Sequence, residues 1–277
     1  MRFGCCINMI ATGDDKIGAE HVELLAAAGY DYLEMPLAEM VQLPDDAFET
    51  LVRRIGASGL KCEACNNLFP ARIRLTGAQA KPDEAREYLK KALARAARIG
   101  AQVVVFGSGG AKRIPEGFDL EKGYEQVVDM TGMVCTMAAQ YGITIAIEPL
   151  RKPECNVINT FEQGVDLARR VGMENCKVLV DFYHLTYEQE SPSVLERWGK
   201  EFLVHIHFAN PAIGTSEERG FPNSPQEWPY EAFVSALQAI PYTGRISVEA
   251  YCSNSLDVQA PVTLRTMKKI FEGGNLQ

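Results

Sequence analysis

The stretch ITIAIEP at residues 143–149 decides the fold, because a short run in which branched residues alternate with small or polar ones ends in a carboxylate, Glu148. Three later stretches have a similar short apolar form and carry a polar residue at or near their end: VLVD at 178–181, VHIHF at 204–208 and ISVE at 246–249. A period of two is typical of a strand, whose successive side chains point to opposite faces. We therefore expect the face that carries Glu148 to line an interior and the branched face to meet helices.

The pattern repeats along the whole chain as short apolar runs followed by longer amphipathic segments. The predicted strands lie at residues 3–8, 32–35, 61–65, 102–106, 143–148, 177–181, 202–207 and 245–249. The predicted helices lie at residues 17–28, 44–56, 82–98, 120–141, 160–171, 192–200, 230–237 and 260–271. Such alternation without a linker predicts an α/β protein with a single (β/α)8 TIM barrel domain over residues 1–277. An open doubly wound sheet is the alternative, but the chain holds more units than that fold usually has.

Composition and charge limit the functions that this barrel can have. The chain carries 28 Lys and Arg against 36 Asp and Glu, a net charge of -8, whereas a nucleic-acid-binding surface is basic. No apolar run approaches the roughly 20 residues that span a bilayer, and the first residues lack the apolar core of a signal peptide. The eight cysteines then indicate reduced thiols in a cytoplasmic protein. We expect no nucleic-acid partner and no membrane partner.

Cys62 and Cys65 form a C-x-x-C pair within a predicted strand. An odd spacing on a strand sends two side chains to opposite faces, so we expect these thiols to diverge. The sequence has no second C-x-x-C pair to complete a zinc site built from thiolates. We interpret the cysteines as small packing residues.

Four side chains of the metal-binding type end four consecutive strands of the predicted barrel: Glu148, Asp181, His207 and Glu249. Active sites of such barrels lie at the carboxyl ends of the strands, so these side chains should share one rim. Carboxylates gathered at one rim repel one another and raise one another's pKa values, and a bound divalent cation removes that cost. Oxygen ligands with one imidazole suit Mn²⁺, with Mg²⁺ or Co²⁺ as alternatives, and the lack of thiolates makes zinc less favoured.

The motifs around these residues are IEPLRKPE, LVDFYH, HIHFAN and SVEA. They resemble the xylose-isomerase-like TIM barrels and, among these, the D-tagatose 3-epimerase and D-allulose 3-epimerase group of sugar isomerases and epimerases. The resemblance covers the whole barrel. It implies a Mn²⁺-type ion held by Glu148, Asp181, His207 and Glu249, with Glu148 and Glu249 also acting as the acid/base pair. It further implies a small sugar as substrate and a homo-oligomer, either a dimer or a tetramer.

The same resemblance implies three residues that bind the substrate. The D-x-x-H motif of the family matches Asp181 and His184, and its second Glu, six residues beyond the first, matches Glu154. Its substrate-binding Arg matches Arg219 in SEERGFP. The segment from His207 to Arg219 is longer than in the epimerase pattern, which leaves the identity of the sugar open.

Polar residues after earlier strands are further candidates for the sugar pocket. Glu34 ends the second strand and Asn67 lies in CNNLFP after the third, so each can line the pocket. The run Gly107-Ser108-Gly109-Gly110 follows the fourth strand and either cradles an anion with its amides or forms a plain tight connection. It lacks the Lys-Ser/Thr of a P-loop and does not match G-x-G-x-x-G. A phosphate bound there would make a sugar phosphate the better substrate.

Epimerisation of a ketose at C3 needs the residue types found in this chain. A proton must leave one face of the carbon next to the carbonyl and return to the other, which calls for two carboxylates, one on each face. A divalent ion chelated by the ketone oxygen and a neighbouring hydroxyl stabilises the cis-enediolate as a Lewis acid. We predict a divalent-metal-dependent sugar epimerase or isomerase, with ketose C3 epimerisation by Glu148 and Glu249 as the first reading.

Other activities use a similar site and remain alternatives. They are hydroxypyruvate-type or aldose–ketose isomerisation, dehydration of a keto-inositol, and cleavage of a 3-keto C-glycoside. A DNA-repair endonuclease with a similar barrel needs a His-rich site for several zinc ions and a basic groove, and this chain has four histidines. A sugar-binding protein without catalysis would not need the paired carboxylates.

Overall fold

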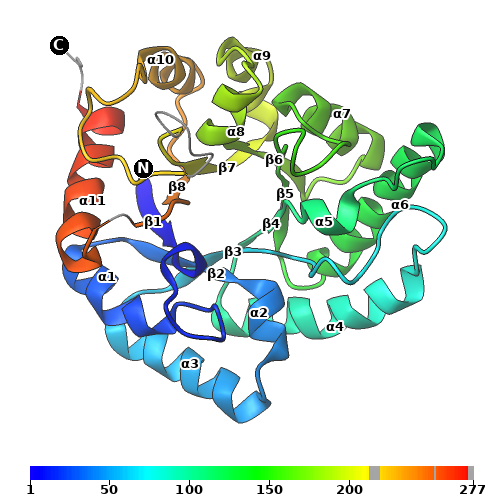
Figure 1. Cartoon of the computed structure of the whole chain (residues 1–277), viewed down its shortest axis with the longest axis horizontal. Coiled ribbons are helices and arrows are strands. Elements are labelled where there is room, and N and C mark those ends of the chain that lie inside the picture. The colour runs from blue at the N-terminus through cyan, green and yellow to red at the C-terminus, as the bar shows by residue number, and fades with distance from the viewer. Residues whose placement is uncertain (212–218, 253, 274–277) are drawn as a thin grey trace.

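The computed structural model describes residues 1–211, 219–252 and 254–273. Their strands close into a parallel barrel in the order of the sequence, from β1 to β8 and back to β1. The strands are β1 (Arg2–Cys6), β2 (Tyr32–Pro36), β3 (Cys62–Asn66), β4 (Val103–Phe106), β5 (Thr144–Ile147), β6 (Cys176–Asp181), β7 (Leu203–Phe208) and β8 (Arg245–Val248). Figure 1 shows the strands at the centre and the helices in a ring around them. The predicted TIM barrel is confirmed.

Helices follow the strands and cover the outside of the barrel. The longer ones are α1 (Val22–Ala28), α3 (Asp45–Ser58), α4 (Pro82–Ile99), α6 (Leu120–Ala139), α7 (Phe161–Val171), α9 (Ser193–Phe202), α10 (Glu231–Ala239) and α11 (Leu256–Glu272). Each overlaps a helix that the sequence pattern predicts. Within the described residues, no helix is both long enough and apolar enough to cross a membrane.

Short helices that the sequence pattern does not predict lie at the carboxyl ends of the strands. They are η1 (Ile7–Ile10), α2 (Leu37–Gln42), α5 (Gly109–Lys112) and α8 (Phe182–Tyr187). The short helix η2 (Ala19–His21) lies within the predicted helix 17–28 and directly precedes α1. Helix α8 begins directly after β6, where the side chain of Asp181 accepts a hydrogen bond of 2.8 Å from the backbone amide of Tyr183. This cap turns the chain sharply at the rim and places the residues of α8 beside the end of the strand.

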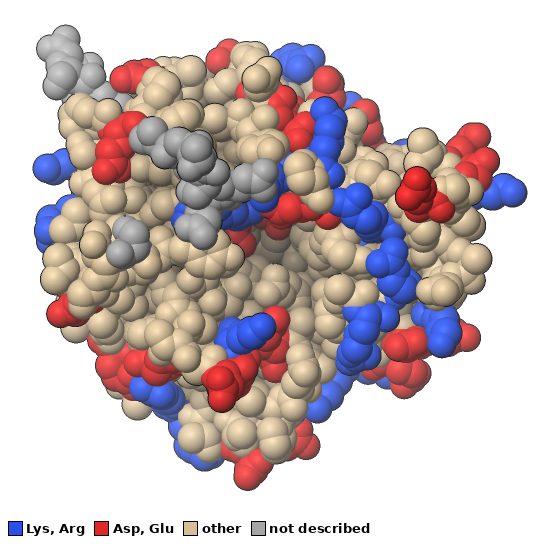
Figure 2. All heavy atoms as spheres, in the orientation of Figure 1, with Lys and Arg blue, Asp and Glu red and all other residues tan. Residues whose placement is uncertain are grey.

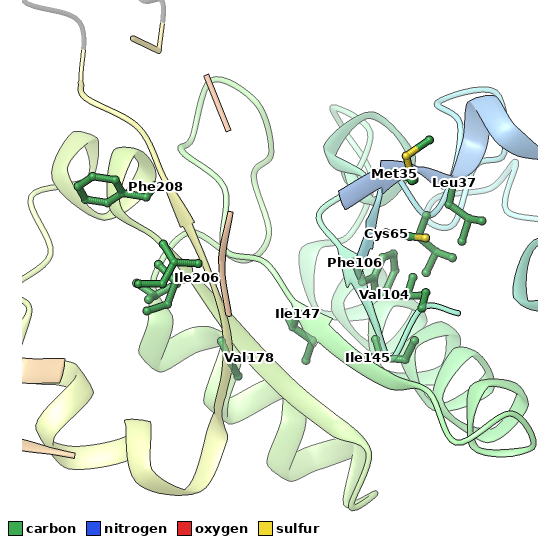
Figure 3. Packing of buried hydrophobic residues seen from close by; sticks show 14 of the residues in the cluster. Met35, Leu37, Cys65, Val104, Phe106, Ile145, Ile147, Val178, Ile206 and Phe208 are labelled. Atoms are coloured by element: carbon green, nitrogen blue, oxygen red, sulfur yellow. The ribbon is translucent and has the colours of Figure 1, made fainter. Parts of the chain in front are cut away.

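Strand β5 alternates as its sequence predicts. In β5, Ile145 and Ile147 belong to the apolar layer between strands and helices, part of which is shown in Figure 3, whereas Ala146 belongs to a small cluster inside the barrel. The members of that inner cluster are Tyr32, Ala64, Val103, Val105, Ala146 and Leu179. Glu148 lies two residues beyond Ala146 and therefore shares the face that points into the barrel.

The prediction that Cys62 and Cys65 diverge is wrong. Their sulfur atoms lie 3.8 Å apart, and both residues pack in the layer between strands and helices. The register between β2 and β3 shifts after Leu33, which leaves Glu63 as an extra residue in β3. A bulge of one residue returns an odd spacing to the same face. Both thiols are nevertheless buried packing residues, as the sequence analysis interprets them.

Candidate metal centre and active site

Four side chains from successive strands converge at the carboxyl end of the barrel. They are Glu148 after β5, Asp181 at the end of β6, His207 in β7 and Glu249 after β8. Each offers one ligand atom, and these atoms all lie within 4.8 Å of one another. An ion about 2.0–2.5 Å from each ligand bridges gaps of that size. The donor set of three carboxylates and one imidazole could therefore hold one divalent cation.

His207 lies between two carboxylates of the cluster on one side and the buried Glu34 on the other. Its Nδ1 lies 2.9 Å from Glu148 Oε1 and 3.2 Å from Glu249 Oε2. Its Nε2 lies 2.8 Å from Glu34 Oε1. Burial acts to lower the pKa of His207, but Glu34 and Glu249 outweigh it and raise that pKa well above its usual value. The ring therefore lies close to three carboxylates, which favour its charged form.

Glu34 occupies a different place from the pocket wall that the sequence predicts for it. The residue is fully buried, and its Oε2 lies 2.7 Å from His205 Nε2 and accepts a hydrogen bond of 2.6 Å from the hydroxyl of Ser247. Burial acts to raise the pKa of Glu34, but His207 and His205 outweigh it and lower that pKa well below its usual value. The side chain is engaged beneath the cluster and is closed to an entering sugar, because residues of β7 and β8 hold both of its oxygens.

Arg219 reaches into the cluster from the segment after β7. Its Nη1 donates to Asp181 Oδ2 over 2.9 Å and also to Glu249, and its guanidinium lies over the ring of Tyr183, 4.6 Å from the ring centroid. Its Nη2 lies 2.6 Å from His184 Nε2. Residues 212–218, which precede Arg219 in the segment of altered length, lie outside the described residues. The structure thus brings Arg219 to the same carboxylates that form the candidate metal site.

The three carboxylates titrate differently because their neighbours differ. Burial raises the pKa of Asp181 to about 7, against the effect of Arg219. Burial, with repulsion from Glu249, also raises the pKa of Glu148 and outweighs the effect of His207. Burial acts to raise the pKa of Glu249 as well, but Arg219 and His207 outweigh it and hold that pKa at about 2. Arg219 and the ring of His207 do not supply enough positive charge to keep all three buried carboxylates ionised. A bound divalent ion would supply the missing positive charge.

Two of the predicted substrate residues border the cluster. His184 in α8 is 2% exposed, and its Nε2 lies 3.6 Å from Asp181 Oδ2. Burial, with Arg219 adding to it, lowers the pKa of His184 well below its usual value, so its ring is neutral. Glu154 Oε2 lies 3.9 Å from the same Nε2, while Glu154 Oε1 accepts a hydrogen bond of 2.6 Å from Arg151. His184, Glu154 and Arg219 therefore form one polar group beside the four candidate ligands.

The structure does not place Asn67 in that polar group. Asn67 is exposed and has a φ of 49°, and its amide lies 3.4 Å from a carboxylate oxygen of Glu39 in α2. The positive φ turns the chain at the end of β3, a role for which Asn is well suited. Phe69, two residues further, is buried against Tyr88 and Phe106 and packs in the core.

The Gly-rich run after β4 supports Glu148 instead of standing open as an anion cradle. A Cβ atom on Gly107 would lie 2.2 Å from Glu148 Oε2, and one on Gly109 would lie 2.8 Å from the backbone oxygen of Glu154. The buried Lys112 donates from Nζ to the backbone oxygens of Phe106 and Glu148, over 3.0 and 3.4 Å. The run is a tight connection, and the lack of a side chain on Gly107 leaves room for the carboxylate of Glu148. In the sequence, the run of four small residues indicates a tight connection but does not show that it packs against Glu148.

The face shown in Figure 2 is hollowed near its centre, over the middle of the barrel. Acidic atoms show at the edge of the hollow, and Lys and Arg side chains run along one side of it. The positive charge of a protein with a net charge of -8 is thus partly gathered beside this opening.

Comparison with known proteins identifies the family. The model of the xylose isomerase-like TIM barrel family matches residues 22–270, so the chain belongs to this family. The resemblance that the motifs carry is confirmed. Among curated relatives, the chain is 25% identical over 256 residues to a D-psicose 3-epimerase of Agrobacterium fabrum, covering 90% of this chain and 80% of that protein. It is 26% identical over 279 residues to an inosose isomerase of Bacillus velezensis, covering 96% of this chain and 95% of that protein.

Two solved structures share the fold over their whole length. A D-psicose 3-epimerase crystallised in the presence of D-fructose matches with a TM-score of 0.81 at 18% identity, covering 99% of this chain and 100% of that chain. An IOLI protein with a bound zinc atom also matches with a TM-score of 0.81, at 19% identity and 100% coverage of both chains. At these identities the likeness to solved structures shows the fold, whereas the two curated relatives are named as an epimerase and an isomerase.

Proposed function

We propose that the protein is a divalent-metal-dependent sugar epimerase or isomerase, and that its first reaction is epimerisation of a ketose at C3. The observation that carries this proposal is the convergence of three carboxylates and one imidazole within 4.8 Å at the carboxyl end of the barrel. Relatives named D-psicose 3-epimerase, L-ribulose 3-epimerase and ketose 3-epimerase support the same class of reaction.

Glu148, Asp181, His207 and Glu249 would hold the ion. Their oxygen-rich donor set favours Mn²⁺, with Mg²⁺ or Co²⁺ as alternatives. The bound ion would supply Lewis-acid polarisation of the substrate carbonyl. The crowding of buried acids around Arg219 supports this assignment, since it leaves negative charge that a cation would neutralise.

Glu148 and Glu249 would move the proton. They come from β5 and β8, on either side of the strands that carry Asp181 and His207, and both reach Nδ1 of His207. A sugar carbon held between them presents one face to each carboxylate. One carboxylate takes the proton from C3, and the other returns a proton to the opposite face of the enediolate, which inverts the centre. In the reverse reaction the two exchange roles.

His184, Arg219 and Glu154 would position the sugar. The neutral imidazole of His184 and the guanidinium of Arg219 can contact hydroxyl and carbonyl oxygens, and Glu154 can accept from a hydroxyl. Arg219 must release part of its contact with Asp181 and Glu249 when ion and sugar are bound. Changing His184 to Ala should raise KM and lower kcat while the metal content stays at one ion for each chain. Loss of metal from that variant would place His184 among the ligands.

Isomerisation of a keto-inositol is the second candidate. The inosose isomerase of Bacillus velezensis aligns over 95% of its own length, whereas the D-psicose 3-epimerase aligns over 80%. Both substrates carry a ketone next to a hydroxyl-bearing carbon, so the two carboxylates would act in the same way on either. A panel that contains D-psicose, D-fructose, D-tagatose and an inosose separates the two candidates.

The decisive experiment follows the proton. The Mn²⁺-loaded protein is incubated with a ketose in D₂O, and we expect deuterium at C3 of the product, since each carboxylate exchanges its proton with solvent between turnovers. Glu148→Gln and Glu249→Gln should each lower kcat by about 10²–10⁴-fold, because an amide cannot accept the proton. Glu63→Gln, at the opposite end of the barrel, is the matched control and should leave turnover unchanged. A product that carries only protium at full conversion would rule out the mechanism.

A further inference from the structure

A buried polar network lies directly beneath the four candidate ligands. Glu34 of β2 stands at its centre: Oε1 faces Nε2 of His207 at 2.8 Å, and Oε2 faces Nε2 of His205 at 2.7 Å. The hydroxyl of Ser247 in β8 also donates to Oε2 over 2.6 Å. These four residues are 0% exposed. The network joins β2, β7 and β8 inside the barrel and touches the candidate metal site through a single residue, His207.

The two nitrogens of His207 face opposite surroundings. Nδ1 faces Glu148 and Glu249, and Nε2 faces Glu34. A neutral imidazole carries a proton on one nitrogen and a lone pair on the other, so the hydrogen bond made by one nitrogen decides the state of its partner. A carboxylate that accepts a hydrogen bond from Nε2 leaves the lone pair on Nδ1, and this is the nitrogen that points into the ligand cluster.

We propose that Glu34 is a positioning residue that holds His207 in its Nε2-protonated tautomer, with the ring fixed so that Nδ1 can bind the divalent ion. The inference rests on the metal-dependent part of the proposed function. It replaces the prediction that Glu34 contacts the sugar. Carboxylates that accept from the far nitrogen of a ligating histidine fix its orientation and raise its basicity toward the metal.

Glu34 could instead be a ligand of a separate ion, because one oxygen of Glu34 and one nitrogen each of His205 and His207 also lie within 4.8 Å of one another. The charges favour the hydrogen-bonded arrangement. Glu34 is the one carboxylate of that group, and its two oxygens are already taken by separate imidazoles and by Ser247. A dication gains more from the neighbouring group with three carboxylates.

The barrel is built to hold this network in place. The hydroxyl of Tyr32 lies 2.8 Å from the oxygen of Ser247, and the Tyr32 ring fills the barrel interior beneath it. A Cβ on Gly4 of β1 would lie 2.3 Å from the Tyr32 ring, so the glycine provides the room that the ring needs. A packed floor of this kind limits the rotation of Glu34 and, through it, of His207.

The test measures metal binding, independently of turnover. The dissociation constant for Mn²⁺ is determined by following free Mn²⁺ with electron paramagnetic resonance, on folded metal-free protein. We expect Glu34→Gln to weaken Mn²⁺ binding by about 10-fold and Glu34→Ala by up to about 100-fold, the range found when a carboxylate behind a ligating histidine is removed. The isosteric Gln variant carries the test if the Ala variant fails to fold. Glu34→Gln with the affinity of the unmodified protein would overturn the proposal.

Glu63→Gln is the matched control, because Glu63 is a second buried carboxylate of the barrel and its side chain bonds to Arg2 and Arg245, away from the four candidate ligands. Its variant should keep the Mn²⁺ affinity even where its stability falls. The tautomer is read from ¹⁵N spectra of the protein loaded with diamagnetic Mg²⁺, which are simple because the chain has four histidines. We expect a proton on Nε2 of His207, and a proton on Nδ1 in the loaded protein would contradict the proposal.

The outcomes separate this inference from the proposed function. An unmodified protein that binds no divalent ion defeats the metal-dependent function itself. One that binds a single Mn²⁺ and loses affinity on Glu34→Gln supports the positioning role, whether or not any ketose is turned over. Two ions for each chain, with one lost in Glu34→Gln, would make Glu34 a ligand and overturn the positioning role.

Discussion

The two ends of the barrel both hold buried acidic groups, but their charges are balanced in different ways. At the amino end, Glu63 accepts hydrogen bonds from two guanidinium groups, over 3.2 Å from Nε of Arg2 and 2.7 Å from Nε of Arg245. At the carboxyl end, several carboxylates share the single guanidinium of Arg219 and the ring of His207. One end has a surplus of positive partners, and the other has a surplus of acids.

The difference shows which end stabilises the fold and which end is built to bind something. The charge of Glu63 is balanced by two guanidinium groups and requires no bound cation, so the amino end closes the barrel and stabilises it. A crowded set of buried acids is costly until a cation arrives. Size alone would mislead, because a cavity of about 630 Å³ lies at the amino end, lined by residues such as Gln102, Tyr242 and Arg245. The charge balance favours the carboxyl end as the functional end.

Metal removal should show the largest difference between the two ends. EDTA treatment should abolish activity, and Mn²⁺ or Co²⁺ should restore it. At a Mn²⁺ concentration of 100 times its dissociation constant, the free energy of unfolding should rise by about 2.7 kcal/mol, because the ion binds only the folded state. Activity assays and urea unfolding with and without Mn²⁺ measure both effects. Full activity in protein shown to hold less than stoichiometric metal would contradict the proposed charge deficit.

Substitution of Gly107 should disturb the carboxyl end by displacing the side chain of Glu148. A Cβ there would lie 2.2 Å from Glu148 Oε2, so Gly107→Ala must displace that carboxylate. We expect kcat to fall by about 10²-fold, because a shift of 1 Å in a catalytic group can cost that much. Gly132→Ala in α6 is the control, since a Cβ there meets no atom within 4 Å. If the two variants have equal kcat, Glu148 is not held where the structure places it.

Neutralising one carboxylate at each end should lower stability at the amino end but not at the carboxyl end. Glu63→Gln leaves Arg2 and Arg245 without their anion and should lower the free energy of unfolding by about 1–3 kcal/mol. Asp181→Asn removes a repelling acid and should leave the metal-free protein as stable as before, or more so, near pH 8. Urea unfolding in EDTA measures both. A loss of stability of the same size in the two variants would mean that the ends are balanced alike.

The last comparison is the pH dependence of the metal-free protein, which reports on the carboxyl end alone. The pKa of Asp181 is about 7 in the folded chain and roughly 3.9 in an unfolded one, so the folded state holds this proton more tightly. Stability should therefore fall as the pH rises from about 4 to 7, with a slope from this group of at most about 1.4 kcal/mol for each pH unit. Unfolding at several pH values in EDTA should show a shallower slope for Asp181→Asn. Identical slopes would mean that Asp181 is ionised throughout.

Much of the fold and of the candidate ligand set could be predicted from the sequence, because both depend on periodicity. Apolar residues recur with a period of two on the buried face of a strand and with a period of 3.6 on the buried face of a helix, so both elements can be recognised in the sequence. Eight repeats of the pair are compatible with few topologies. Since the carboxyl ends of parallel strands meet at one edge, Glu148, Asp181, His207 and Glu249 were predicted to come together, and the structure brings them within 4.8 Å. Their role as ligands remains a prediction.

Contacts between distant strands were decided only by the tertiary structure. The bulge at Glu63 places Cys62 and Cys65 on the same face instead of on opposite faces, because register depends on the partner strand and cannot be read from one strand. The barrel covers Glu34 with His205 and His207, which are more than 170 positions away in the sequence. A local pattern states which side of a strand a residue takes, but closure of the barrel determines which residues it meets there.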